Sequence, residues 1–175
     1  KSLIGLSNLV KKTLETEAQI QSACSSFVDA KGSMFLGRGS SFPIALEGAL
    51  KLKELAYIHA EGYPAGEMKH GPLALIEDGM PVVVIAPRDN FYNKTISNMQ
   101  EVIARGAKVL LITNKSSDEI FSENIWQKIE VENTDDDLLP FLITIPLQKL
   151  AYHSALKKGY DIDKPRNLAK SVTVE

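Results

Sequence analysis

The sequence predicts an α/β domain in which helices cover both faces of a parallel sheet. Pro81–Ala86 and Lys108–Thr113 are continuous runs of β-branched and aliphatic residues, which is typical of strands buried on both faces. Segments with helical spacing of apolar residues lie between such runs. Because strands alternate with helices along the chain, we expect parallel strands joined by right-handed crossovers.

The first half of the chain predicts two helices and one strand. In order, these are a helix at Lys11–Ala30, a strand at Ser33–Leu36 and a long helix at Ser41–His59. Ser40 or Ser41 is the expected N-cap of the long helix, and Pro43 falls in its first turn. The Gly- and Pro-rich residues 61–72 predict a loop, and Leu73–Ile76 is too short to assign.

The second half predicts three strands and two helices. In order, these are Pro81–Ala86, the helix Phe91–Arg105, Lys108–Thr113, the weaker strand Trp126–Val131 and the helix Asp135–Lys158. Gly106 and Gly159 are expected to end the two helices. Ligands of parallel sheets bind at the carboxyl ends of the strands, so the loops that follow the strands are the first place to seek a site.

Composition bounds the class of protein. The 175 residues fit one domain. A net charge of −2 and a pI of about 6.0 argue against nucleic acid or an anionic membrane as a main partner. The lone cysteine, Cys24, is expected to be a buried structural thiol, which fits the reducing cytosol.

Neither the first residues nor the longest apolar stretch of the sequence indicates a targeting or membrane segment. The first residues lack the sustained apolar core of a signal peptide. Leu138–Ala155 is apolar but is interrupted by polar residues and prolines, so we expect a buried helix and not a membrane span. Because the sequence begins with Lys1 and not with Met, we expect it to be a piece of a longer protein.

The long helix has two chemically different faces. At 100° per residue, Ala45, Ala49, Leu52 and Ala56 fall on one line, and these small and apolar residues would pack on the sheet. The opposite line holds Glu47, Lys51, Glu54 and Ile58. One interpretation is a solvated face with spaced ion pairs. The other is a site where a carboxylate moves a proton between sugar carbons and an ammonium stabilises the enediolate.

Of the three histidines, only His70 falls in a predicted loop. His59 is expected at a helix end, and His153 inside an apolar helix where a core role is favoured. A loop histidine suits general acid–base chemistry, although an ordinary polar turn is the alternative. No cluster of His, Cys and Asp has the spacing of metal ligands, so we expect neither a metal nor a cofactor.

Two further segments could contact a ligand. Gly37–Ser41 follows a strand and begins a helix, so its backbone amides and the hydroxyls of Ser40 and Ser41 could bind an anion. The alternative is that the segment is only a turn and an N-cap. The last residues include Lys170, whose amine could form an imine with a sugar carbonyl if the tail docks. A plain surface lysine is the alternative.

These pieces together resemble one family. The stretches LGRGSSFPIALEGALKLKELAYIHAEGYPAGEMKHGPLALI and DKPRNLAKSVTVE are similar to the second sugar-isomerase domain of the glucosamine-6-phosphate synthases, also called glutamine–fructose-6-phosphate aminotransferases (isomerising). The resemblance covers nearly the whole chain. It implies a three-layer αβα sandwich of the SIS, flavodoxin-like kind with a five-stranded, mainly parallel sheet. It also implies an SIS domain at 1–159 and a tail at 160–175 that closes over the active site.

The resemblance assigns roles to four side chains. Glu54 matches the base that moves the proton between C1 and C2 of the sugar, and Lys51 matches the lysine that assists this step. His70 matches the histidine that helps to open the ring, reaching the site from the neighbouring subunit. Lys170 matches the lysine proposed to hold the open ketose as a Schiff base.

The resemblance also implies which residues bind substrate. Leu168 and Ala169 match the part of the tail that covers the sugar. In the family, the loop that grips the sugar phosphate belongs mainly to the preceding domain. Ser40 and Ser41 therefore stay only secondary candidates for substrate contact.

The implied activity converts fructose 6-phosphate and glutamine-derived ammonia to glucosamine 6-phosphate, the first step of hexosamine biosynthesis. The implied setting is a cytoplasmic homodimer, with upstream SIS and glutaminase domains in the same polypeptide and no cofactor, so this piece alone is expected to be incomplete. Two alternatives stay open: a stand-alone sugar-phosphate isomerase, and a sugar-phosphate-sensing SIS module without catalysis.

Overall fold

A five-stranded sheet forms the centre of the molecule. The structure, a computed structural model, describes residues 2–116 and 125–166. The strands are β1 (Ser33–Gly37), β2 (Ala60–Pro64), β3 (Pro81–Ile85), β4 (Lys108–Asn114) and β5 (Ile125–Val131). They lie in the order β2-β1-β3-β4-β5, and every pairing is parallel. The predicted five-stranded α/β sheet is confirmed, and the described strands are all parallel.

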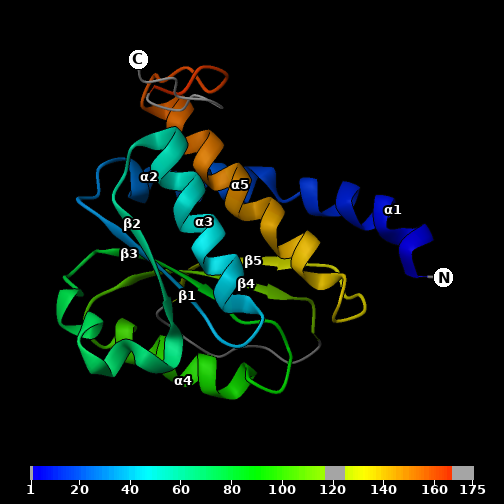
Figure 1. The fold of residues 1–175 in the computed structure, drawn as a ribbon, viewed down its shortest axis with the longest axis horizontal. Helices are drawn as coiled ribbons and strands as arrows, with labels where there is room; N and C mark the ends of the chain where they lie inside the picture. Colours follow the sequence, from blue (N-terminus) through cyan, green and yellow to red (C-terminus); the bar gives the residue numbers. More distant parts are fainter. Residues whose placement is uncertain (1, 117–124, 167–175) are drawn as a thin grey trace, which may run out of the picture.

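Helices cover the two faces of this sheet (Figure 1). The α-helices are α1 (Ser2–Leu14), α2 (Glu17–Val28), α3 (Ser41–Ala56), α4 (Tyr92–Ile103) and α5 (Leu139–Lys157), and two 3₁₀ helices are η1 (Ala65–His70) and η2 (Pro72–Leu75). One buried cluster joins α2, α3 and α5 to the sheet, whereas a second joins η1 and α4 to its other face. This arrangement is the predicted three-layer sandwich.

The edge strand β2 lies where the sequence predicted a loop. Ala60–Pro64 pairs in parallel with β1, from Ser33 opposite Ala60 to Gly37 opposite Pro64. Its composition of Ala, Glu, Gly, Tyr and Pro has little β-propensity. Proline and charged residues are nevertheless tolerated at a sheet edge, where one side of the strand needs no partner.

Several helix boundaries also differ from the prediction, and α5 begins at Leu139 and not at Asp135. The segment predicted as one helix at Lys11–Ala30 is two helices, and the first of them begins at Ser2. At the break, the hydroxyl of Thr16 donates to the carbonyl of Thr13 at 2.8 Å, a local bond that competes with the helical ladder. The long helix α3 ends at Ala56 and not at His59, because Tyr57 takes a left-handed conformation with φ 54°. As a consequence Ile58 turns inward and is 3% exposed.

Small residues let α3 lie close to the sheet and to α5. Ala45, Ala49 and Ala56 are at most 1% exposed, which confirms the predicted inward line. At Gly48, a Cβ would lie 3.0 Å from side-chain atoms of Leu147 and of the β1 residue Phe35. Helices approach this closely only where side chains are absent. The outward line of α3 is thereby fixed as rigidly as the core.

The predicted core roles of two polar side chains are confirmed. Cys24 is 3% exposed, and burial raises the pKa of its thiol. His153 of α5 is also buried, and its Nε2 lies 2.9 Å from a carboxylate oxygen of Glu17 on α2. Across residues 2–116 and 125–166, the helices are too short or too polar to span a bilayer.

Replacing Leu52 by alanine tests the packing of α3. Leu52 is fully buried in the larger core cluster, so Leu52→Ala should lower the free energy of unfolding by about 2–5 kcal/mol through lost burial and a cavity. Leu50, on the same helix but 40% exposed, is the matched control. Leu50→Ala should cost well under half as much in urea denaturation, and equal losses in both variants would contradict the described orientation of α3.

Candidate functional site

The outward face of α3 carries two ion pairs that share Lys51. Lys51 Nζ donates a hydrogen bond to a carboxylate oxygen of Glu54 at 2.6 Å and lies 3.7 Å from a carboxylate oxygen of Glu47. The helix sets this spacing, because residues three and four apart share a face. The side chains of Lys51 and Glu54 are 29% and 25% exposed, so they are held by the fold yet reachable from outside.

The pair has a defined charge state at neutral pH. The hydrogen bond that Lys51 donates to Glu54 raises the pKa of the Lys51 ammonium above its ordinary value, and the charge of Glu47 adds to the effect. Lys51 is therefore protonated throughout the physiological range. It can donate hydrogen bonds and stabilise negative charge, whereas proton abstraction in this pair falls to a carboxylate.

His70 lies on the other side of the sheet from this pair. It ends η1, whose Ala65 and Met68 are buried in the cluster of α4, whereas α3 belongs to the opposite cluster. The His70 side chain is 74% exposed, and its Nε2 lies 3.9 Å from a carboxylate oxygen of Glu67. Within one chain, the sheet therefore separates His70 from Lys51 and Glu54.

Ser40 and Ser41 lie at the other end of α3. They line a cavity of about 160 Å³ at the carboxyl ends of β1 and β3, the neighbours between which the strand order reverses. Ser40 occupies the predicted N-cap position but makes no side-chain capping bond. Asp89 and Asp136 also line the cavity, and their negative charge opposes a phosphate there.

The helix separates the two serines from the ion pair. Thirteen residues from Ser41 to Glu54 correspond to a rise of about 20 Å, longer than a hexose phosphate. One such molecule cannot contact both places. Because α3 starts at the carboxyl end of β1, Lys51 and Glu54 lie toward the amino edge of the sheet, and not in the loops where parallel sheets usually bind ligands.

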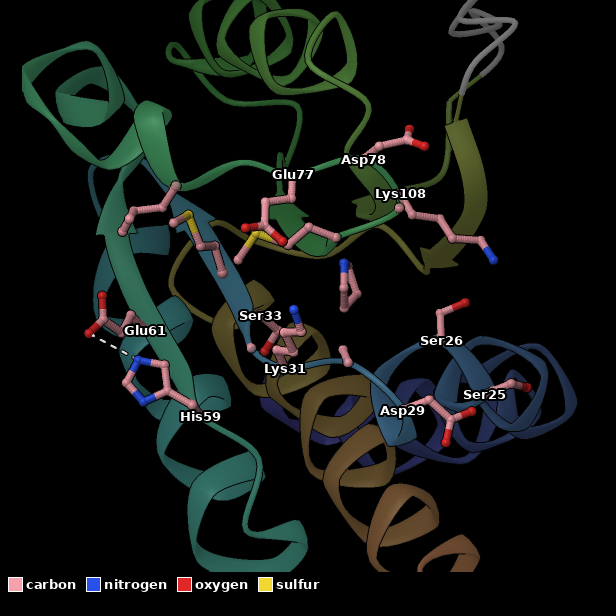
Figure 2. A pocket seen from close by; sticks show the side chains of 17 residues that line it. Ser25, Ser26, Asp29, Lys31, Ser33, His59, Glu61, Glu77, Asp78 and Lys108 are labelled. Carbon is pink, nitrogen blue, oxygen red and sulfur yellow. Dashed lines mark ion pairs between the residues drawn. The ribbon is translucent and has the colours of Figure 1, made fainter.

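A larger cleft of about 660 Å³ opens at the amino edge of the sheet (Figure 2). Its charged lining residues are Asp29, Lys31, His59, Glu61, Glu77, Asp78 and Lys108. The only ion pair drawn among these residues joins His59 to Glu61, at 3.3 Å. None of the described candidate residues lines this cleft, so its size alone does not make it the site of the predicted chemistry.

The first part of the tail, up to Arg166, docks on the end of α3. The Arg166 amide donates to the Tyr57 hydroxyl at 2.6 Å, and its guanidinium lies 4.1 Å from the Tyr57 ring centroid. Tyr57 follows Glu54 by three residues. Sequence reasoning missed both partners, because it placed Tyr57 inside a helix that continued to His59.

The rest of the tail, with Leu168, Ala169 and Lys170, lies outside the described residues. In the described part of the chain, His, Cys, Asp and Glu side chains form no group of three or more that could hold a metal ion.

Comparison with known proteins places this geometry in a family. The SIS domain model matches residues 26–158. Curated relatives named glutamine–fructose-6-phosphate aminotransferase [isomerizing] are 49% identical over the whole chain in Bartonella henselae and 52% identical over 95% of it in Brucella abortus biovar 1. The chain spans only 29% and 27% of the lengths of these two relatives.

Solved structures agree with this result. The C-terminal domain of glucosamine-fructose-6-phosphate aminotransferase from Francisella tularensis superimposes with a TM-score of 0.88 at 46% identity, over 93% of this chain and 45% of that one. A Thermotoga maritima protein described as a glucosamine-6-phosphate deaminase gives 0.71 at 26% identity, over 96% of this chain and 49% of that one. With more than half of its residues matched by the SIS model and a fold shared with these structures, the chain belongs to the SIS-domain family.

Proposed function

We propose that this chain is the isomerising part of an enzyme that converts fructose 6-phosphate and glutamine-derived ammonia to glucosamine 6-phosphate. The observation that carries the proposal is the rigid Lys51–Glu54 pair on the outward face of α3, with its 2.6 Å hydrogen bond. Identities of 49% and 52% to relatives named for this activity support it. Since the chain spans under a third of those relatives, the complete activity requires further parts of a longer polypeptide.

The proposed reaction uses the pair as a base and an electrostatic stabiliser. The Lys170 amine first condenses with the C2 carbonyl of the open ketose, and water leaves. Ammonia then adds at C2 of this Schiff base and the Lys170 amine leaves, which gives the C2 imine. The Glu54 carboxylate then takes a proton from C1 and returns it at C2, while the C1 hydroxyl loses its proton and the nitrogen gains one, which leaves the amino-aldose. The protonated Lys51 stabilises the negative charge that develops between the two proton transfers.

His70 is proposed to serve the site of a neighbouring subunit. It is exposed and lies across the sheet from Glu54, so its own chain cannot bring it to that carboxylate. A homodimer in which η1 of one subunit faces α3 of the other would complete the site. In that position His70 would move a proton between the ring oxygen and the C2 hydroxyl as the sugar opens.

The remaining contacts are assigned to the tail and to the upstream chain. Lys170 is proposed to hold the open ketose as a Schiff base, with Leu168 and Ala169 covering the sugar. An upstream SIS domain would grip the phosphate, since the carboxylates beside Ser40 and Ser41 disfavour an anion there. The proposed compartment is the cytoplasm, which fits the buried, unpaired thiol of Cys24.

Replacing each carboxylate of the ion pair separates a catalytic from an electrostatic role. Glu54→Gln in the full-length enzyme should lower kcat for glucosamine 6-phosphate formation by about 10²–10⁴-fold, because an amide cannot accept the C1 proton. Glu47→Gln is the matched control, since Glu47 also pairs with Lys51 but at 3.7 Å. It should retain activity within about threefold.

Near-normal turnover in Glu54→Gln would sink the assignment of the base. Equal losses in both variants would show instead that the net charge of the face matters and that neither carboxylate has a specific role. Lys170→Ala, assayed alongside, should abolish most turnover if the ketose is held as a Schiff base.

Mixing two inactive variants tests whether the site spans two subunits. Full-length His70→Ala and Glu54→Gln enzymes, co-refolded or co-expressed at equal amounts, should recover about a quarter of wild-type activity, because half of the dimers are mixed and each has one intact site. If both residues served the site of their own chain, mixed dimers would contain no intact site. Mixtures no more active than either variant alone would then count against the shared site.

A further inference from the structure

The backbone that leads into the tail follows a defined path. After α5, the Tyr160 amide bonds to the Ala155 carbonyl at 3.0 Å and the Gly159 amide to the Leu156 carbonyl at 2.9 Å, the paired bonds of a Schellman motif. The Asp161 carboxylate then accepts hydrogen bonds from the amides of residues 163 and 164. These bonds direct the chain from the end of α5 back toward the end of α3 (Figure 1).

At the end of α3, Tyr57 occupies a backbone position that usually belongs to glycine. Its φ of 54° makes it the only non-glycine residue with positive φ among residues 2–116 and 125–166. Its amide bonds to the Lys53 carbonyl at 3.2 Å, which is the single bond of an αL helix end. Glycine adopts this conformation freely, whereas a tyrosine does so at a cost in free energy. Contacts made by the tyrosine side chain would offset that cost.

The Tyr57 side chain contacts the first part of the tail, residues 160–166, which we call the tail root. Its ring meets the Tyr160 ring edge-on, with centroids 4.9 Å apart. The Arg166 guanidinium lies 4.1 Å from the Tyr57 ring centroid and 5.9 Å from that of Tyr160. The Arg166 amide also donates to the Tyr57 hydroxyl at 2.6 Å. We define Tyr57, Tyr160 and Arg166 as the tail anchor.

We propose that Tyr57 is a positioning residue that fixes the root of the tail beside Glu54. This inference rests on the proposed function. Tyr57 ends the helix that carries Glu54, and Lys170 follows Arg166 by four residues, a span of roughly 14 Å at full extension. With Arg166 held at the end of α3, this chain length limits how far Lys170 can range from Tyr57. Such tethering raises the effective concentration of a reactive group and lowers the entropy lost when it reaches the substrate.

Three substitutions separate positioning from plain stability. Tyr57→Gly removes the ring, but glycine suits the left-handed backbone. We therefore expect α3 to end at the same residue and the unfolding temperature of the protein to stay unchanged. Tyr57→Phe keeps the ring contacts and loses only the hydroxyl that accepts from Arg166. Tyr152→Phe is the control, because the Tyr152 ring meets the ring of His153 edge-on and has no part in the contacts of Tyr57.

The first readout needs no catalysis. Trypsin cleaves after Arg166 only when the stacked guanidinium is released, so the cleavage rate, followed by mass spectrometry, reports on the anchor directly. In the full-length enzyme, Tyr57→Gly should speed cleavage after Arg166 about tenfold or more. Tyr57→Phe should have a smaller effect, and Tyr152→Phe none. Unchanged cleavage in Tyr57→Gly would overturn the proposal.

The second readout is turnover. Tyr57→Gly should lower kcat for glucosamine 6-phosphate formation about tenfold or more, with a smaller change in KM for fructose 6-phosphate, and Tyr57→Phe should restore most of it. If Tyr57→Gly is cleaved faster but keeps a normal kcat, Tyr57 is not a positioning residue. A kcat loss that follows a lowered unfolding temperature would also overturn positioning, because this indicates a structural role. If Glu54→Gln and Lys170→Ala are fully active, the proposed function itself is wrong. The cleavage rate then still tests whether Tyr57 anchors the tail.

Discussion

The close packing of α3 between the sheet and α5 is the constraint on which the rest of the structure depends. A Cβ at Gly48 would lie only 3.0 Å from side-chain atoms of Phe35 and Leu147, so the helix lies against both and cannot move closer to them unless their side chains shift. A helix fixed on its inner line is fixed on its outer line as well. The hydrogen bond between Lys51 and Glu54 is therefore held by the core, without the loop flexibility that usually accompanies a binding site.

The same packing places two of the candidate residues on different sides of the sheet. The sheet stands between α3 and η1, so Glu54 and His70 face different sides of the molecule. Meanwhile the direction of α3, set by its start at the carboxyl end of β1, brings its last turn to the returning tail root at Arg166. Under the proposed function, the reaction takes place near the last turns of α3, and a partner subunit, the upstream chain and the tail supply the groups that the sheet separates from Glu54.

Sequence alone predicted the features that depend on side-chain period, and it missed those that depend on tertiary pairing. The buried line of α3 followed from the 100° helical turn, and β3 and β4 from their β-branched runs. The edge strand β2 was missed because its residues have little β-propensity and only pairing with β1 makes them a strand. The turn at Tyr57 was missed because the helical pattern continues to Ile58, whereas a distant contact with Arg166 accompanies the actual end. The candidate ion pair was found by spacing, but its roles rest on the family resemblance.

The central claim is that the outward face of α3 touches the reacting carbons of a sugar phosphate. A crystal structure of the full-length enzyme with glucosamine 6-phosphate bound tests it most directly. The account predicts a Glu54 carboxylate oxygen within about 3.5 Å of C1 or C2, with His70 of the partner subunit near the ring oxygen. A sugar bound between Ser41 and Asp89 at the carboxyl edge, with Glu54 about 20 Å away along α3, would contradict it.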